Sequence, residues 1–231
     1  MSEWLLYWGA INWIPALVSM AWIPWAIGSL VRLLDSLRWF VPAAFGVALV
    51  ALSGWPFALL AFAITVAVVS LLTLPWQVNG NLRRCLPVYM ALLAGGLLSA
   101  PAVLPMFPYV RYSERPIDSG LLWRTSIAAL TAVGMPFYRT SWFAFDKVRI
   151  VALPMTYVAW FIPVVLANAG VRRMLRTPAE GVVLVVAVWL ACMSMLPLIG
   201  HFRWMFRLLP YYHFALIVLT ALVLSRCWEP L

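Results

Sequence analysis

Acidic side chains are scarce in this sequence. Asp and Glu together number 7 against 16 Lys and Arg in 231 residues, and charged residues of both signs make up 10% of the chain. A soluble domain is about a quarter charged and about half apolar, whereas this chain is 65% hydrophobic with a mean hydropathy of +0.97. The shortage of charge excludes an ordinary soluble domain and predicts an integral membrane protein.

Cysteine is also rare, and the sequence lacks the common catalytic motifs. The three cysteines, Cys85, Cys192 and Cys227, stand alone without a CxxC pair, so neither a disulfide framework nor a cysteine metal site is indicated. There is no P-loop, dinucleotide glycine motif or nucleophile elbow, which argues against an ATP-driven or soluble-type active site. We expect no cofactor, although the sequence leaves a divalent metal open.

The positive charges have a membrane interpretation. A formal charge of +9 would suggest a nucleic-acid partner in a soluble protein. In a membrane protein, basic loops flank the spans and face anionic lipid. We therefore expect membrane lipids as partners and no nucleic acid. The first positive charge is Arg32, so a basic leader region is missing and no cleavable signal peptide is expected.

Long apolar runs predict the fold class. A membrane span needs about 20 apolar residues, and we expect a single integral membrane domain over residues 1–231, an all-α polytopic bundle of transmembrane helices. It should contain about seven spans, with six to eight as the range. The expected spans cover approximately residues 12–34, 39–52, 57–76, 86–104, 150–169, 181–199 and 214–224.

The distribution of arginine predicts the orientation. Short basic turns with Arg32/Arg38, Arg83/Arg84 and Arg172/Arg173/Arg176 are expected on the cytoplasmic side. The N-terminus, the loop 106–149 and the loop 201–213 are then outside, and the C-terminus is inside. The apolar run 126–135 in the long outer loop is too short to cross the membrane, so we expect a re-entrant or interfacial helix there.

The stretch Gly95–Pro116 marks the predicted exit of the chain to the outer face. Pro101, Pro105 and Pro108 are expected to stop the helix there. Small residues precede them and should allow neighbouring helices to approach closely: Gly95, Gly96, Ser99 and Ala100.

Arginines in the two outer loops form the candidate binding site. Arginine forks suit bidentate contacts with phosphate, and the outer loops carry Arg111, Arg115, Arg203 and Arg207. We expect these four to bind the phosphate of a lipid-linked donor or a lipid headgroup. The spacing of Arg203 and Arg207 would place both on one face of a helix. The alternative is that all four side chains extend to the interface without a specific ligand.

Candidate catalytic groups are few. Glu114, Asp118 and Asp146 lie on the expected outer loop and could act as a base or metal ligand, or could only pair with neighbouring basic residues. His201 and His213 lie at the two ends of the arginine-rich loop. Two histidines twelve residues apart, with no fixed carboxylate beside them, are only weak evidence for a metal site. We therefore predict no metal site.

Short motifs in the middle of the chain resemble a known family. The matching residues are Ser53, Gly54, Pro56, Ser99, Ala100, Pro101, Leu104, Pro105, Tyr109, Ser113 and Arg115, and the stretch 202–210 resembles the entry to a later span. This pattern is similar to bacterial YfhO-type polytopic membrane proteins, of which the chain would be a partial or shortened relative. That family is similar to the GT-C glycosyltransferases. The resemblance implies binding of a polyprenyl-phosphate-linked sugar at the outer face of the bacterial inner membrane, and glycosyltransferase activity in cell-envelope synthesis.

Two alternatives to the enzyme remain open. No Asp-bearing outer loop precedes Ser53, as the catalytic acid of a GT-C enzyme would require, which favours a non-catalytic integral subunit of a larger membrane complex. A small transporter or channel component is the third hypothesis. It is disfavoured because no ionisable residue is expected within a span.

Overall fold

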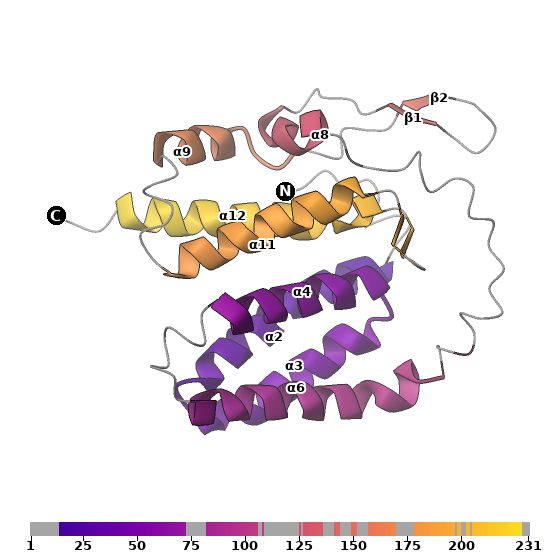
Figure 1. Ribbon diagram of the computed structural model, residues 1–231, viewed down its shortest axis with the longest axis vertical. Helices are drawn as coiled ribbons and strands as arrows, with labels where there is room; N and C mark the ends of the chain where they lie inside the picture. Colours follow the sequence, from indigo (N-terminus) through magenta and orange to yellow (C-terminus); the bar gives the residue numbers. More distant parts are fainter. Residues whose placement is uncertain are drawn as a thin grey trace. The chain divides into compact units, whose positions relative to one another are not determined.

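The computed structural model describes residues 14–72, 82–105, 108, 125, 127–135, 141–143, 149–151, 157–169, 178–196, 198–199, 202–203 and 205–227 (Figure 1). The chain divides into two compact units. The N-terminal unit is Trp13–Pro116, and the C-terminal unit is Ile117–Leu231 together with Met1–Asn12. Both are built mainly from helices, as the composition predicts, and two short pairs of strands occur in the C-terminal unit.

Helix α3 lies between α2 and α6 in the N-terminal unit (Figure 1). The elements of this unit, in order, are α2 (Ile14–Leu33), the 3-10 helix η2 (Leu37–Trp39), α3 (Phe40–Leu52), α4 (Pro56–Leu72) and α6 (Leu82–Val103). Four of the predicted spans therefore have a helix in the expected place.

Two glycines set how closely α3 approaches its neighbours. A Cβ atom placed on Gly95 of α6 would lie 2.6 Å from the carbonyl oxygen of Ala44 and from Cβ of Val47. On Gly46, a Cβ would lie 3.0 Å from Cα of Ala26 in α2. The predicted close approach is confirmed at Gly95. It is wrong at Gly96, where an added Cβ meets nothing within 4 Å, because that residue is on the exposed side of α6.

The prolines do not all end α6. Pro101 lies inside the helix, which continues to Val103, so the prediction that it stops the helix is wrong. A proline in the last turn removes one backbone donor, and the turn still closes because Leu104 N–H donates to the Ala100 carbonyl at 2.8 Å. Pro105 follows in the turn beyond the helix. The third proline, Pro108, is described only as an isolated residue.

Helices α11 and α12 run side by side in the C-terminal unit (Figure 1). The elements of this unit are α8 (Ile127–Thr131), η4 (Ala132–Gly134), β1 (Ser141–Phe143), β2 (Arg149–Val151), α9 (Phe161–Ala169), α11 (Pro178–Met195), β3 (Leu198–Ile199), β4 (Phe202–Arg203), η5 (Met205–Leu208) and α12 (Leu209–Cys227). Strands β1 and β2 are antiparallel, and so are β3 and β4.

The short helical segment predicted at 126–135 is present as α8 and η4. Three hydrogen bonds among the described residues attach it to the rest of the unit. Tyr212 Oη–H donates to the Leu130 carbonyl at 3.1 Å, and Val158 N–H and Ala159 N–H both donate to the Val133 carbonyl, at 2.9 and 3.3 Å. Gly134 also approaches α9 closely, since an added Cβ would be 2.9 Å from Cγ of Pro163. Whether the segment is re-entrant or interfacial stays a prediction.

Among the described residues, three helices are long and apolar enough to cross a membrane. They are Ile14–Leu33, Cys85–Val103 and Met205–Ser225, and three shorter apolar helices accompany them: Leu37–Leu52, Pro56–Ser70 and Glu180–Met195. Length and composition therefore support a helical membrane protein. The count of seven spans, the outer position of the N-terminus and the long outer loop stay predictions.

Three predicted spans have wrong boundaries. In the span expected at 181–199, helix α11 ends at Met195, and Leu198 and Ile199 form strand β3. In the span expected at 150–169, residues 149–151 pair with β1 as strand β2, and the described helix α9 begins at Phe161. The strand is in keeping with the preference of β-branched Ile150 and Val151. The last span begins at Leu209 and not at 214. Pro210 explains the earlier start, since proline is tolerated in the first turn of a helix.

Candidate functional site

The structure describes two of the seven predicted site residues. Arg203 lies on β4, where its backbone is opposite Leu198 of β3, and Arg207 lies in η5. The predictions for the other five fall outside the described residues: Arg111, Glu114, Arg115, Asp118 and Asp146.

Arg203 and Arg207 do not share a helix face as the sequence predicted. The spacing argument requires an α-helix through both residues, but Arg203 is in an extended strand and Arg207 is in a 3-10 helix. The strand forms because Phe202 and Arg203 pair back onto Leu198 and Ile199. The two arginines therefore belong to a strand and helix that precede α12.

Arg207 is held at the start of a candidate span. The other residues of η5, Met205, Phe206 and Leu208, are 0% exposed, whereas Arg207 is half-buried. The apolar stretch Met205–Ser225 begins within the same turn. The Nε atom of Arg207 is buried, so the protein holds at least this part of the guanidinium at the end of the apolar helix.

The sequence analysis missed two buried ionisable side chains in the C-terminal unit. His213, expected in a loop, lies inside α12 and is 1% exposed. It also lies within the candidate span Met205–Ser225, so the expectation that no span contains an ionisable residue is wrong. Glu180 is 2% exposed in the first turn of α11, where the helix dipole stabilises a carboxylate.

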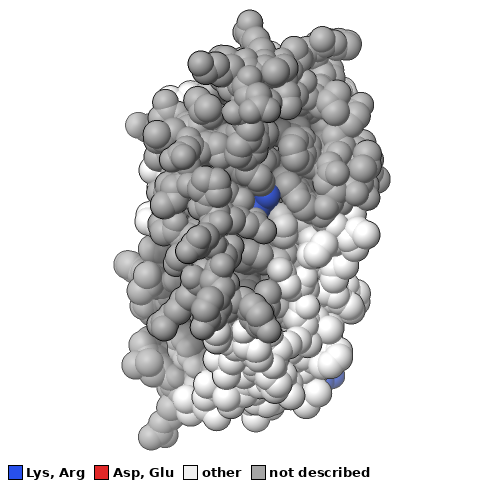
Figure 2. All heavy atoms as spheres, turned by 90° about the vertical axis from the view of Figure 1, so that its right-hand side faces the viewer, with Lys and Arg blue, Asp and Glu red and all other residues white. Residues whose placement is uncertain are grey.

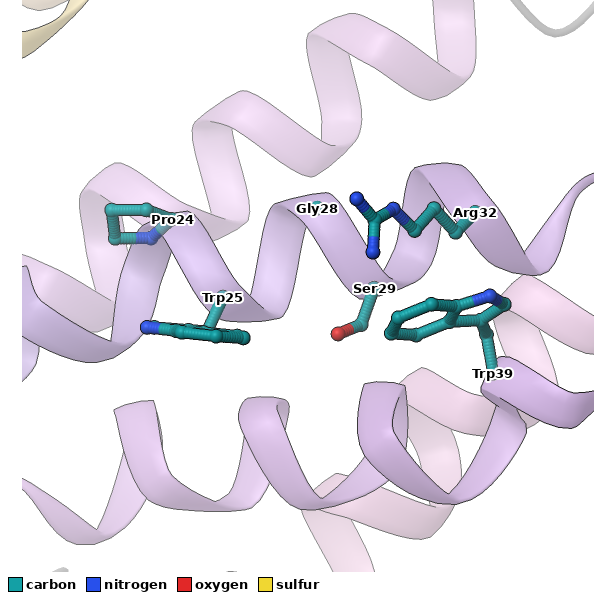
Figure 3. Close-up of a pocket in the computed structure, with 6 residues that line it drawn as sticks. All are labelled: Pro24, Trp25, Gly28, Ser29, Arg32 and Trp39. Atoms are coloured by element: carbon teal, nitrogen blue, oxygen red, sulfur yellow. The ribbon is translucent and has the colours of Figure 1, made fainter.

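A second arginine site is present at the end of α2, and the sequence analysis had treated it only as a charged turn. A cavity of about 270 Å³ is lined by Pro24, Trp25, Gly28, Ser29, Arg32 and Trp39 (Figure 3). Cζ of Arg32 lies 4.6 Å from the centroid of the Trp39 ring, within the range of a cation–π contact. Figure 3 shows the Ser29 hydroxyl between the two indoles.

Local sequence explains why these residues meet. Trp25 and Arg32 are seven residues apart on α2, so about two helical turns bring them to the same face. The chain then reverses, because Asp35 N–H and Ser36 N–H both donate to the Arg32 carbonyl, at 3.2 and 3.1 Å. This turn brings Trp39 back beside Arg32. The equal spacing of Trp25, Arg32 and Trp39 is the signal that could have indicated the site.

Charge is sparse on the described surface. Blue atoms are isolated and no red atoms are visible among the described residues on the face drawn in Figure 2. Within the described ranges, no group of three His, Cys, Asp or Glu residues is placed to hold a metal ion.

No protein-family model, curated protein or solved structure matches this chain. The resemblance to YfhO-type proteins consequently stays a prediction carried by the quoted motifs alone.

Proposed function

We propose that this chain is a membrane protein that binds the phosphate of an anionic lipid through Arg203 and Arg207. The lipid is a polyprenyl-phosphate-linked sugar bound at the outer face, and the protein is a GT-C-like glycosyltransferase of the bacterial cell envelope. The observation that carries this proposal is the position of Arg207, half-buried in η5 at the start of the apolar stretch Met205–Ser225.

The chemistry of the ligand supports this choice. A phosphate offers oxygens at the spacing of a guanidinium fork, and such charge-assisted pairs are short and strong. The long apolar tail of a polyprenyl carrier would lie beside the membrane helices while its phosphate stays at headgroup level. In sugar transfer, a carboxylate from the outer loop would take the proton of the acceptor hydroxyl, and Glu114, Asp118 and Asp146 are the proposed sources.

An exposed apolar face favours a second function, that of a non-catalytic subunit in a larger membrane complex. Exposed large side chains recur on α6 at helical spacing: Leu86, Met90, Leu93 and Leu97. Only 22% of the most apolar part of this helix is buried inside the protein. Such a stripe suits contact with lipid or with a helix of a partner subunit.

The test is binding of a polyprenyl-phosphate sugar to the purified protein by native mass spectrometry. Replacing both Arg203 and Arg207 with Gln should weaken binding by about tenfold, the loss expected when charged hydrogen bonds to phosphate are removed. The Arg38→Gln variant is the control, because Arg38 is an exposed arginine on η2. Equal binding by the double variant and the native protein would overturn the proposal.

Catalysis is tested separately from binding. If the chain is the enzyme, Asp146→Asn or an equivalent change at Glu114 or Asp118 abolishes sugar transfer while leaving lipid binding unchanged. Sugar transfer that survives all three changes would reject these acids. Stable copurification with other membrane subunits, together with no transfer by the isolated chain, would favour the second function.

A further inference from the structure

We infer that the groove at the end of α2 is a binding site for an anionic phospholipid. The phosphate of the bound lipid contacts Arg32. The glycerol and the upper part of the acyl chain lie between Trp25 and Trp39, which line the groove together with Arg32 (Figure 3). This site shares no residue with Arg203 and Arg207 and does not depend on the function proposed for them. By the arginine pattern, it would serve the cytoplasmic leaflet.

The charge of Arg32 is available to an external anion. The nearest acid in sequence is Asp35, and within the described chain Arg32 forms no ion pair with it. The Arg32 side chain contacts the Trp39 ring, with Cζ 4.6 Å from the ring centroid. A cation–π contact orients the guanidinium without neutralising it, so its N–H groups can still donate to phosphate oxygens.

The shape of the groove suits a headgroup with an attached chain. Arg32 and Trp25 are seven residues apart, or about 10 Å along the helix axis, which spans the depth from a phosphate to the first acyl carbons. Gly28 lies between them, and a Cβ added there meets nothing within 4 Å. The cavity of about 270 Å³ is far larger than the roughly 30 Å³ that one water molecule occupies.

The surroundings of the groove select a lipid over a soluble anion. Trp25 is 68% exposed and Val31 is 53% exposed, and 33% of the most apolar part of α2 is buried inside the protein. Most of this candidate span is therefore left to the hydrocarbon. Tryptophan and arginine at the end of such a helix occupy the headgroup level, where anionic phospholipids carry the available phosphate.

The experiment compares binding of phosphatidylglycerol and phosphatidylcholine with the same acyl chains, measured by native mass spectrometry of the purified full chain. The native protein should prefer the anionic lipid. Arg32→Gln should reduce phosphatidylglycerol binding about fivefold, the effect of one basic residue near the membrane surface, and should leave phosphatidylcholine binding unchanged. Arg38→Gln, a matched loss of charge on the adjacent η2, should change binding less than twofold.

A second variant tests the groove without changing charge. Gly28→Leu places a side chain in the groove that Gly28 lines, its Cβ meets nothing within 4 Å, and it should reduce phosphatidylglycerol binding at least as much as Arg32→Gln. Gly96→Leu adds the same side chain at another helical glycine whose added Cβ meets nothing within 4 Å, and it should leave phosphatidylglycerol binding unchanged. Equal losses of phosphatidylglycerol binding in Arg32→Gln and Arg38→Gln, or full binding by Gly28→Leu, would overturn the proposed site.

The Arg203/Arg207 double variant should keep full phosphatidylglycerol binding at the groove. This result separates the test of the groove from the test of the proposed function.

Discussion

The two compact units of this protein differ in which kind of packing contact is most prominent. The largest fully buried side chains of the described residues belong almost entirely to the C-terminal unit, including Phe206, Leu190 and Ile162, and Val50 represents the N-terminal unit among them. The N-terminal unit instead brings backbones together at Gly46 and Gly95. Large buried side chains are therefore more prominent in the C-terminal unit and close backbone approaches in the N-terminal unit, although each unit has both: Gly134 approaches Pro163 closely, and Phe57 is buried.

This difference shows how the two units use their apolar surface. In Met205–Ser225, 56% of the most apolar part is buried inside the protein, against 33% for Ile14–Leu33 and 22% for Cys85–Val103. Lipid tails are as apolar as leucine, so membrane helices gain little from hiding large side chains and associate through close backbone contact. The N-terminal unit follows this principle, whereas the C-terminal unit has a core like that of a soluble protein.

The largest effect should come from Phe206→Ala in the C-terminal unit. Phe206 is 0% exposed, and truncating a buried phenylalanine to alanine lowers the free energy of unfolding by about 3–5 kcal/mol through lost contacts and a cavity. Val50→Ala in the N-terminal unit should lower it less, because fewer atoms are removed. Thermal unfolding in detergent measures both, and equal losses in the two variants would contradict the contrast between the units.

The next largest effect should come from Gly95→Ala in α6. Its added methyl would lie 2.6 Å from the Ala44 carbonyl oxygen, so α3 and α6 must separate, and overpacking of this kind lowers the free energy of unfolding by about 1–3 kcal/mol. Gly96→Ala is the matched control and should be neutral or stabilising by up to about 1 kcal/mol, since alanine favours the helix and meets no neighbour there. The two melting temperatures in detergent decide this, and similar values would rule out close packing at Gly95.

The smallest effect should come from Tyr212→Phe. This change removes the hydrogen bond from Tyr212 Oη to the Leu130 carbonyl at 3.1 Å and keeps the aromatic ring, so the free energy of unfolding should fall by about 0.5–1.5 kcal/mol. The loss should be accompanied by faster hydrogen exchange in α8, which this bond attaches to α12. Unchanged exchange at α8 would show that the bond does not hold the segment.

Apolar patterning predicted where the helices are, but less well where they begin. The segments 39–52 and 86–104 correspond to α3 and α6 because each run is bounded by charge, proline or a turn. The start of α9 was mispredicted because an apolar run also suits a strand, and only the pairing of Arg149–Val151 with β1 decides between them. The start of α12 was mispredicted because Pro210 was taken as part of a loop, although proline is common in a first helical turn.

The candidate sites were less predictable because they depend on contacts between segments. Arg207 could be named from the sequence as a cation beside an apolar run. Its separation from Arg203 could not, because the i, i+4 spacing assumes a helix where the chain forms a strand. The sequence predicted Arg32 only as part of a charged turn. Its contact with Trp39 depends on the chain reversal at Asp35 and Ser36, which the sequence pattern did not predict.

The short helix α3 has a consequence for the bilayer around it. Its 13 residues extend about 20 Å, less than the hydrocarbon thickness of about 30 Å. If α3 and α4 form a membrane hairpin, as the sequence predicts, we expect the turn at Ser53 and Gly54 to lie below the headgroups. Ser53 N–H donates to the Leu49 carbonyl at 3.0 Å and Gly54 N–H to the Ala51 carbonyl at 3.3 Å, so the turn satisfies these donors without water. We expect the membrane to thin beside this hairpin, and its position to depend on the acyl-chain length of the surrounding lipid.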